Sequence, residues 1–369
     1  MNGGILLSAP LYQMIYTDLK KQIEQGHYVI NDLLPTEKEL AALYSVSTIT
    51  AKKALDLLKE EGYILRKPRK GSVIISNRKN ESTFEKLIIG LVITNFSDFF
   101  GTQILRSILN YDAEKLNVIV KITYGDLKKE NEYIQELIDI GIQGLILLPP
   151  SSEYTSPKIL ELIARDFPVV VIDRLMDQLP VCSVQTDSFS ASKELTNYLF
   201  EQGHQKIGLL TSDSRVSTID ERVDGFLSAH VDANRAVSQK QIFSVIDSVV
   251  PGSSRSITED VELIVEFLQK NPEITALFTT EYNIALLAKS AIEQQSKAVP
   301  NDYSIVCFDH PTINLFDLNA FTFTHIEQDQ TSIGHEAMTL LLRKIKDPTL
   351  IEKVNLGYQL IEGDSVSSL

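Results

Sequence analysis

Apolar positions in the first eighty residues recur at the spacing of short helices. The first helix is expected over residues 10–25, where the apolar stripe consists of Leu11, Ile15, Leu19 and Ile23. Thr36 followed by Glu39 is the pattern of a capping box, so a second helix should begin there. Ser47 can cap a third helix a few residues later. The pattern therefore predicts three helices, with a tight turn between the last two.

The last two helices have the spacing of a helix-turn-helix. Their core-facing positions would be Leu40 and Leu43 on the first, and Ala51, Ala54, Leu55 and Leu58 on the second. The opposite face of the second helix carries Thr48, Ile49, Lys52 and Lys53 near its N-terminal end. In a helix-turn-helix this end lies in the DNA major groove, where base edges are read. We therefore expect these four side chains to face DNA.

A β-hairpin with a basic tip is expected directly after this helix, which should end at Gly62. The strands would span residues 63–67 and 72–75, with Arg69 and Lys70 at the tip. Such a wing is placed to contact phosphates or a minor groove. The alternative is a small helical domain with a solvated basic hairpin. Residues 77–86 are polar and without periodicity, which indicates a linker between domains.

From residue 87 onward the chain alternates short apolar runs with amphipathic segments. The apolar runs cover residues 88–93, 118–122, 144–148, 169–172, 206–210, 276–278 and 304–308, and the helical patterns include 102–116, 129–140 and 191–202. This alternation predicts parallel strands covered by helices on both faces. A single sheet is possible, but two doubly wound lobes fit the length better. Ligands of such sheets bind beyond the carboxyl ends of the strands.

Charge is divided unevenly along the 369 residues. Residues 1–80 hold 12 Lys and Arg against 8 Asp and Glu, and the rest holds 23 against 41. A modestly basic N-terminal part on an acidic body suits one DNA-facing domain. Cys182 and Cys307 could form a disulfide, but isolated thiols in a reducing cytosol are the better interpretation. The N-terminus lacks a signal-peptide pattern and no apolar run of about 20 residues exists, so a cytoplasmic protein without a membrane span is expected.

Motifs of catalysis are missing from the chain. It contains no Gly-x-Ser-x-Gly, His-Glu-x-x-His, Gly-x-x-x-x-Gly-Lys or Gly-x-Gly-x-x-Gly. Its six histidines do not have metal-ligand spacing. We therefore expect neither an enzyme, nor a metal, nor a cofactor.

Several linked motifs in the N-terminal part resemble one known family. They are Pro10-Leu11-Tyr12, Ile23-Glu24-Gln25-Gly26-His27-Tyr28, Leu34-Pro35-Thr36-Glu37, Val46-Ser47-Thr48-Ile49-Thr50, Gly62-Tyr63-Ile64 and Lys70-Gly71-Ser72. They resemble the winged-helix domain of the gluconate-repressor (GntR) family. The resemblance implies DNA contacts from Lys38, Thr48, Thr50, Lys52, Arg69, Lys70 and Gly71, beside the exposed Ile49 and Lys53. The family usually has Arg where this chain has Thr48, so a bidentate guanine contact is missing there.

The remainder resembles a second family, the effector domain of lactose/galactose-repressor (LacI/GalR) regulators, which is similar to periplasmic sugar-binding proteins. The segments that carry this resemblance are 89–92, 99–100, 168–174, 203–207, 221–226, 299–309 and 333–337. The two resemblances together imply a winged domain over 1–76 and a two-lobed domain over 87–369, joined by the linker expected over 77–86. One lobe would hold 87–187 and 329–346, and the other 188–327 and 353–369, with crossovers at about 187, 328 and 348. A few regulators combine the two families, and the chain resembles that architecture.

The second resemblance also implies a sugar site made of Phe99, Phe100, Asp173, Arg174, Arg222, Glu281, Asp309 and Gln328. Aromatic rings can cover the apolar face of a sugar, while carboxylates, amides and guanidinium groups bond its hydroxyls. Either phenylalanine could instead belong to the core, and Arg222 could anchor its loop by a surface pair with Glu221. Glu281 and Tyr282 replace the Asn and Asp that are common in the family.

Together these patterns predict a homodimeric, ligand-responsive transcription factor, most simply a repressor of a sugar uptake or catabolism operon. Its partners would be operator double-stranded DNA, a sugar effector and a second copy of the chain. The dimer interface would use helices over 102–109 and 133–140. The alternatives are a sugar-binding transport component, an α/β enzyme acting on sugars, and a regulator with another effector or with activator or corepressor action.

Overall fold

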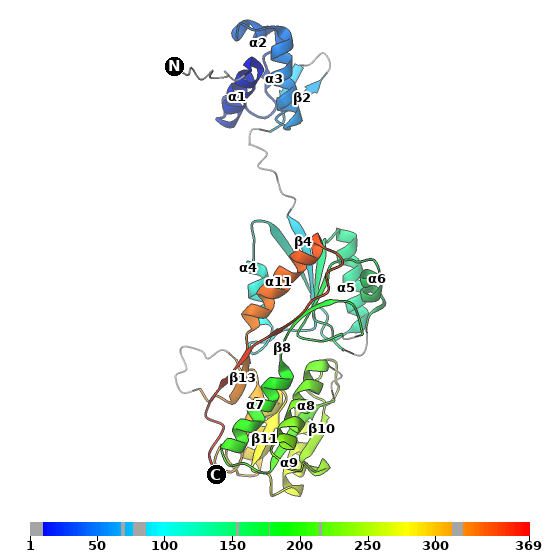
Figure 1. Ribbon diagram of the computed structural model, residues 1–369, viewed down its shortest axis with the longest axis vertical. Coiled ribbons are helices and arrows are strands. Elements are labelled where there is room, and N and C mark those ends of the chain that lie inside the picture. The colour runs from blue at the N-terminus through cyan, green and yellow to red at the C-terminus, as the bar shows by residue number, and fades with distance from the viewer. Residues whose placement is uncertain are drawn as a thin grey trace, which may run out of the picture. The chain divides into compact units, whose positions relative to one another are not determined.

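A computed structural model describes residues 10–67, 71–76, 86–152, 155–176, 178–213, 216–311 and 320–369. It divides into two compact units, one ending at Lys86 and one spanning Leu87–Leu369 (Figure 1). No helix among these residues has the length and apolar character needed to cross a membrane.

The N-terminal unit is a winged helix-turn-helix, as predicted. Its elements are α1 (Leu11–Glu24), β1 (Leu33–Leu34), α2 (Glu37–Leu43), α3 (Thr48–Glu60), β2 (Ile64–Lys67) and β3 (Gly71–Ile74). The strands form an antiparallel sheet in the order β1-β3-β2. The side chains of α1 and α3 that face inward are buried in one core with Tyr63 and Ile74.

Local capping explains where these helices begin and end. The main-chain N–H of Thr36 donates to Glu39 Oε2 at 2.7 Å, and Thr36 Oγ1 accepts the Glu39 N–H, which completes the predicted capping box. Ser47 Oγ accepts the N–H of Thr50 at 3.1 Å and caps α3. Gly62, just beyond α3, has φ +75°, a conformation that favours glycine.

Two positions of the predicted apolar faces are not buried. Leu11, the first residue of α1, is 55% exposed. Leu43 is 70% exposed, whereas Leu40 and Ala41 of the same helix are buried. At about 100° per residue, the buried face of α2 is centred between Leu40 and Ala41, so Leu43 lies about 110° from that centre. It therefore points to solvent.

The C-terminal unit consists of two doubly wound lobes, which confirms the predicted fold class. The sheet of lobe 1 has the order β14-β8-β7-β6-β4-β5, with bounds Lys353–Leu356, Cys182–Thr186, Val169–Ile172, Gly144–Leu147, Leu87–Ile93 and Leu116–Ile122. The sheet of lobe 2 has the order β10-β9-β11-β12-β13-β15, with bounds Ile242–Ile246, Ile207–Ser212, Ala276–Thr279, Ser304–Phe308, Thr324–Gln328 and Tyr358–Ile361. Neighbouring strands are parallel except for β13 and β15.

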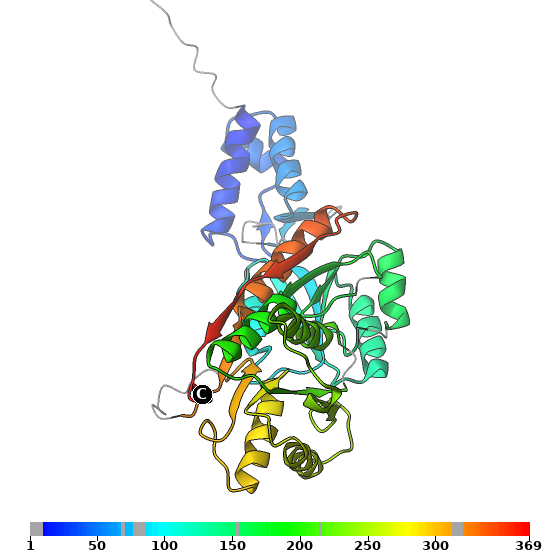
Figure 2. The same ribbon diagram turned by 60° about the horizontal axis from the view of Figure 1, so that its bottom comes forward.

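Helices cover both faces of each sheet (Figures 1 and 2). In lobe 1, α4 (Thr102–Asn110) and α11 (Gln330–Lys346) pack on one face, and α5 (Leu127–Ile140) and α6 (Pro157–Ala164) on the other. In lobe 2, α7 (Ser188–Glu201) and α8 (Ser217–Asp232) pack on one face, and α9 (Ile257–Lys270) and α10 (Tyr282–Gln294) on the other. A short 3₁₀ helix spans Gln239–Gln241. Cys182 and Cys307 are buried free thiols.

The third crossover between the lobes lies later than expected. The chain crosses at Asp187, at Asp329 and at Gly357, and not at about 348, because β14 pairs in parallel with β8 of lobe 1. Residues 353–356 therefore belong to lobe 1, and only β15 joins lobe 2. The physical reason is that β8 and β13 would each leave unpaired main-chain groups at a sheet edge. In the C-terminal segment, β14 pairs with β8, and β15 then pairs with β13. Figure 2 shows this segment, in red, running from one lobe to the other.

Candidate functional site

The exposed face of α3 presents most of the residues that were expected to contact DNA. Thr48, Ile49, Lys52 and Lys53 are exposed, and Ile49 is 77% exposed although it is apolar. The Lys53 ammonium lies 4.0 Å from the centre of the Tyr12 ring, an arrangement typical of a cation–π contact. Thr50 is half-buried, and its hydroxyl bonds Ser47, so it belongs to the helix cap.

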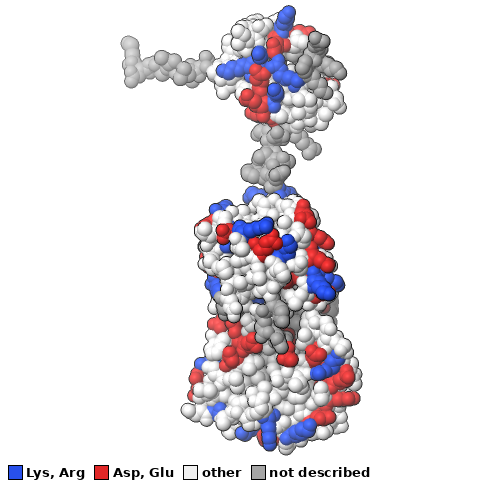
Figure 3. Space-filling model, turned by 90° about the vertical axis from the view of Figure 1, so that its right-hand side faces the viewer, with Lys and Arg blue, Asp and Glu red and all other residues white. Residues whose placement is uncertain are grey.

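The remaining DNA-contact residues lie at α2 and the wing. Lys38 is exposed on α2, and Gly71 begins β3 with φ +88°. Arg69 and Lys70 lie outside the described residues. On the face drawn in Figure 3, Lys and Arg side chains of this unit are interspersed with acidic ones, so this face is not uniformly basic.

The base of the wing is held by an arginine that the sequence did not single out. Arg66 of β2 donates through Nη1 to Asp56 of α3 at 2.5 Å and through Nη2 to Glu37 of α2. One guanidinium group thus joins the wing strand to both helices of the helix-turn-helix.

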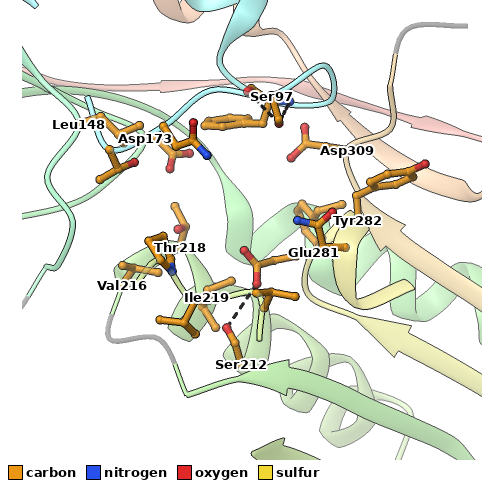
Figure 4. A pocket seen from close by; sticks show the side chains of 18 of the residues that line it. Ser97, Leu148, Asp173, Ser212, Val216, Thr218, Ile219, Glu281, Tyr282 and Asp309 are labelled. Atoms are coloured by element: carbon orange, nitrogen blue, oxygen red, sulfur yellow. Dashed lines mark hydrogen bonds between the residues drawn. The ribbon is translucent and has the colours of Figure 1, made fainter. Parts of the chain in front are cut away.

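All eight predicted sugar-site residues line a single cavity of about 410 Å³ between the two lobes. Each follows or ends a strand, except Arg222, which lies on α8. Phe99 and Phe100 follow β4, Asp173 and Arg174 follow β7, Glu281 follows β11, Asp309 follows β12, and Gln328 ends β13. The cavity therefore lies at the carboxyl ends of the strands, where ligands of such sheets bind. Figure 4 shows Asp173 and Asp309 on opposite sides of its open centre.

Three carboxyl groups line this cavity, those of the buried Asp173 and Asp309 and of the half-buried Glu281, and desolvation raises the pKa of each. The pKa of Asp309 rises to about 7, and those of Asp173 and Glu281 rise from their ordinary values. The positive charge of Arg222 opposes all three shifts. Gln328 Nε2 donates to Asp309 Oδ2 at 2.8 Å, which also favours the carboxylate.

The two arginines are held in the cavity wall by main-chain oxygens. Arg222 is 5% exposed; its Nη1 donates to the Thr280 carbonyl at 2.8 Å, and its guanidinium lies 4.0 Å from the centre of the Phe308 ring. It is therefore not the surface pair that was considered as an alternative. Arg174 Nη1 donates to the Pro149 carbonyl.

Several buried polar atoms of the cavity lack a hydrogen-bond partner among the described residues. They are Arg174 Nε, Arg222 Nε, Asp309 Oδ1 and Gln328 Oε1. Leaving such groups unpaired is unfavourable, so a bound water or a polar ligand would stabilise them. In the part of the chain that the structure describes, no group of three or more His, Cys, Asp or Glu side chains could hold a metal ion.

The two phenylalanines differ in their surroundings. Phe100 packs partly against the core of lobe 1, in agreement with one of the alternatives. Phe99 faces lobe 2, where its ring centre lies 5.2 Å from that of Tyr282. Gln330, the first residue of α11, accepts the N–H of Gly101 and donates to the Phe99 carbonyl, so it fixes the loop between them.

Cross-lobe contacts hold the lobes together beside the cavity. The N–H of Ser217 donates to Ser152 Oγ at 2.9 Å, and Ser217 Oγ accepts the N–H of Leu175 at 2.8 Å. At another side, Gly125 of lobe 1 lies so close to Pro251 that an added Cβ would be 2.7 Å from the proline Cβ. These contacts bridge the two lobes next to the cavity.

Sequence reasoning missed several lining residues. Ser212 donates to Glu281 Oε2 at 3.3 Å (Figure 4), and Thr218, Ile219 and Tyr282 also line the cavity. Ser212 ends β9, so the rule that ligands bind at carboxyl ends of strands could have identified it. Thr218 and Ile219 lie in the first turn of α8 and carry no comparable signal.

Both units match known sequence families. Residues 11–74 match bacterial regulatory proteins of the gntR family, and residues 196–366 match the periplasmic binding protein-like domain. The chain is 27% identical over 356 residues to the arabinose metabolism transcriptional repressor of Geobacillus stearothermophilus, covering 95% of each chain. It is 28% identical over 265 residues to the ribose operon repressor of Haemophilus influenzae, covering 72% of this chain and 76% of the relative.

Solved structures share the fold of the C-terminal unit. A putative ribose operon repressor from Burkholderia thailandensis superposes with a TM-score of 0.64 and 21% identity, covering 75% of this chain and 99% of that one. A LacI-family transcriptional regulator from Enterococcus faecium, solved with bound ribose, has a TM-score of 0.62 and 23% identity, covering 76% and 99%. These likenesses establish the two-lobed fold.

Proposed function

Because the chain joins a DNA-binding domain of the gntR family to a periplasmic-binding-protein-like domain, we propose that it is a ligand-responsive transcriptional repressor. It binds operator DNA through its winged helix-turn-helix and a sugar in the cleft between its lobes. The observation that carries this proposal is the interlobe cavity in which eight aromatic, acidic, amide and guanidinium side chains converge. The site binds its ligand and does not transform it.

The lining of the cavity suits a small hydroxyl-rich molecule. Phe99 offers an aromatic face for the C–H groups of a sugar ring. Asp173 and Asp309 approach the centre from opposite sides and can accept hydrogen bonds from sugar hydroxyls, while Arg174 can donate to ring or hydroxyl oxygens. A volume of about 410 Å³ lies in the lower part of the range of small-molecule sites. The named relatives repress arabinose metabolism and a ribose operon, so pentoses are the first ligands to test.

DNA recognition follows from the exposed end of α3. Thr48, Ile49 and Lys52 would meet base edges in the major groove, while Lys38 and the wing residues Arg69 and Lys70 would meet phosphates. Two copies of the chain would place two winged helices on the half-sites of a palindrome. The dimer interface would involve α4 and the Tyr133–Ile140 part of α5.

Regulation requires that the sugar prefers one arrangement of the dimer. When the lobes close around a sugar, the orientation of lobe 1 relative to lobe 2 changes. This change alters the dimer interface, and with it the spacing of the two DNA-binding domains. A tenfold loss of operator affinity needs a coupling free energy of only about 1.4 kcal/mol. The sugar therefore releases the repressor from its operator.

The test is a thermal-shift screen of L-arabinose, D-ribose, D-xylose and a set of hexoses and disaccharides, followed by gel shifts on an operator selected from random DNA. We expect one pentose to raise the melting temperature and to weaken DNA binding. If no sugar raises the melting temperature or weakens DNA binding, the proposal of a sugar effector is wrong. If no DNA sequence is selected, the proposal of a DNA-binding regulator is wrong.

A further inference from the structure

A buried carboxylate outside the cavity ties together one loop of its wall. Asp260 lies in the first turn of α9 and is 0% exposed. Its Oδ2 accepts the main-chain N–H groups of Asp247 at 2.9 Å and Ser248 at 2.7 Å, and its Oδ1 accepts Arg255 Nη1 at 3.1 Å. One side chain therefore pins both ends of the segment 247–255.

Internal hydrogen bonds make this segment compact. Ser253 Oγ donates to the Asp247 carboxylate at 2.7 Å and accepts the N–H of Arg255 at 3.0 Å. The N–H of Val250 donates to the Asp247 carbonyl at 2.9 Å, and the Arg255 guanidinium also donates to the Val245 carbonyl. The conformation of the loop is thus determined by polar contacts that converge on Asp260 and Arg255.

The tip of the loop belongs to the effector cleft. Val249, Val250 and Pro251 line the cavity, and Pro251 makes the close approach to Gly125 of lobe 1. Gly125 has φ +80° and no room for a Cβ, so both its conformation and its contact require glycine. The loop therefore forms a wall of lobe 2 and one of the contacts between the lobes.

The sheet cannot hold this loop by itself. The strand before it, β10, is the edge of its sheet, pairs only with β9 and is irregular between Phe243 and Ile246. Its other side has no strand partner in the described part of lobe 2. Val249 packs against the core of the lobe, and the carboxylate of Asp260 adds the polar connection that fixes the main chain of the loop to α9.

We propose that Asp260 is a positioning residue for the effector cleft: its carboxylate holds the loop 247–255 in the conformation that closes against Gly125. This inference rests on the proposed function, because it assumes that the cleft binds a sugar. A loop that is ordered before binding loses less conformational freedom when the ligand arrives, so the ligand is held longer. Hydrogen bonds to the carboxylate lower its pKa against the effect of burial, so it remains charged and its bonds are charge-assisted.

The decisive variant is Asp260→Asn. Its amide NH₂ replaces one of the two acceptor oxygens and therefore faces either the main-chain N–H groups of residues 247 and 248 or the Arg255 guanidinium, all of which are donors. The matched control is Glu259→Gln, the preceding residue of the same helix, whose exposed side chain closes the capping box with Ser256 and can do so as an amide. Hydrogen–deuterium exchange of the full chain without sugar should be at least tenfold faster in Asp260→Asn over residues 247–255 and over the facing segment 124–126. Glu259→Gln should match the unchanged protein in both segments.

The second measurement uses the pentose that the thermal-shift screen identifies. Asp260→Asn should release it about tenfold faster, with an association rate within twofold and with operator affinity in the absence of sugar within twofold. A role in overall stability alone would lower the melting temperature without this separation of the two rates. Ser253→Ala, which removes only the bonds inside the loop, should show the same pattern more weakly and serves if Asp260→Asn does not fold.

Two results would overturn the inference. One is unchanged exchange over 247–255 in both Asp260→Asn and Ser253→Ala. The other is faster exchange with unchanged sugar release. If no sugar binds the unchanged protein, the proposed effector is wrong, and the exchange result still decides whether Asp260 holds the loop.

Discussion

Ser217 and Ser152 join the two lobes of the C-terminal unit by reciprocal hydrogen bonds. The N–H of Ser217 donates to Ser152 Oγ at 2.9 Å, and Ser152 Oγ lies 3.2 Å from Ser217 Oγ, to which it donates. Ser217 begins α8, the helix that carries Arg222 into the cavity. A contact between the lobes is therefore built onto an element that also holds a candidate ligand-binding side chain.

Ser217→Ala should weaken sugar binding by about three- to tenfold, because it removes the hydroxyl that accepts bonds from Ser152 and from the Leu175 N–H. A single hydrogen bond contributes about 1 kcal/mol net. Titration calorimetry with the identified sugar measures the loss. Ser238→Ala, at the start of the 3₁₀ helix and away from the cavity, should bind as the unchanged protein does. Equal affinity in both variants would show that the closed contact does not assist binding.

Arg174→Ala should abolish the response to sugar while DNA binding persists. The residue lines the cavity, and its loss also removes a positive charge that favours the ionised form of Asp173. We expect sugar affinity to fall by about a hundredfold or more, since charge-assisted bonds to a ligand contribute about 1.5–3 kcal/mol each. The measurements are calorimetry and a gel shift with added sugar. Arg165→Ala, an exposed surface pair with Glu161, is the control; unchanged sugar affinity in Arg174→Ala would refute the assigned site.

Lys52→Ala should weaken operator binding about tenfold or more and alter sequence preference, because Lys52 is exposed near the start of α3. Lys59→Ala, in the last turn of the same helix, should leave preference unchanged. Selection from random DNA followed by gel shifts separates the two effects. Binding by Lys52→Ala at the affinity and preference of the unchanged protein would contradict the docking of α3.

Sugar affinity should fall as the pH drops below about 7. Burial raises the pKa of Asp309 to about 7, so the ligand-free protein holds a proton there that sugar hydroxyls would displace by donating to the carboxylate. Binding should therefore release a proton, with a loss of up to about tenfold in affinity per pH unit. The same group makes the ligand-free fold less stable as the pH rises from about 4 to 7, since the unfolded carboxyl ionises first.

Calorimetry at pH 6, 7 and 8 in two buffers of different ionisation enthalpy counts the protons released. Asp309→Asn should bind sugar weakly and without this pH dependence. Glu130 needs a separate control, because burial raises its pKa to about 7 as well; Glu130→Gln should keep the pH dependence if Asp309 is its source. A flat profile in the unchanged protein would contradict the assigned role of Asp309.

Short-range signals determined most of the secondary structure from the sequence. The Thr36–Glu39 capping box, the Ser47 cap and Gly62 act within three or four residues, so their effect can be read in the order of the side chains. The apolar runs identified the parallel strands β4, β5, β6, β7, β9, β11 and β12 for the same reason, but not β8, β10, β13 or β14. The candidate site residues could be named because the chain resembles the LacI/GalR effector domain, and the parallel topology brings the strand ends that all but Arg222 follow to one edge.

Contacts distant in the chain were decided only by the tertiary structure. Residues 353–356 could pair with either sheet on grounds of pattern, and the open edge of β8 selected lobe 1. Ser152 and Ser217, Phe99 and Tyr282, and Gly125 and Pro251 meet across the lobes, and no local pattern marks any of these pairs. Side-chain spacing reports which face of an element is buried, but the partner of that face depends on how sheets pair and how the lobes close.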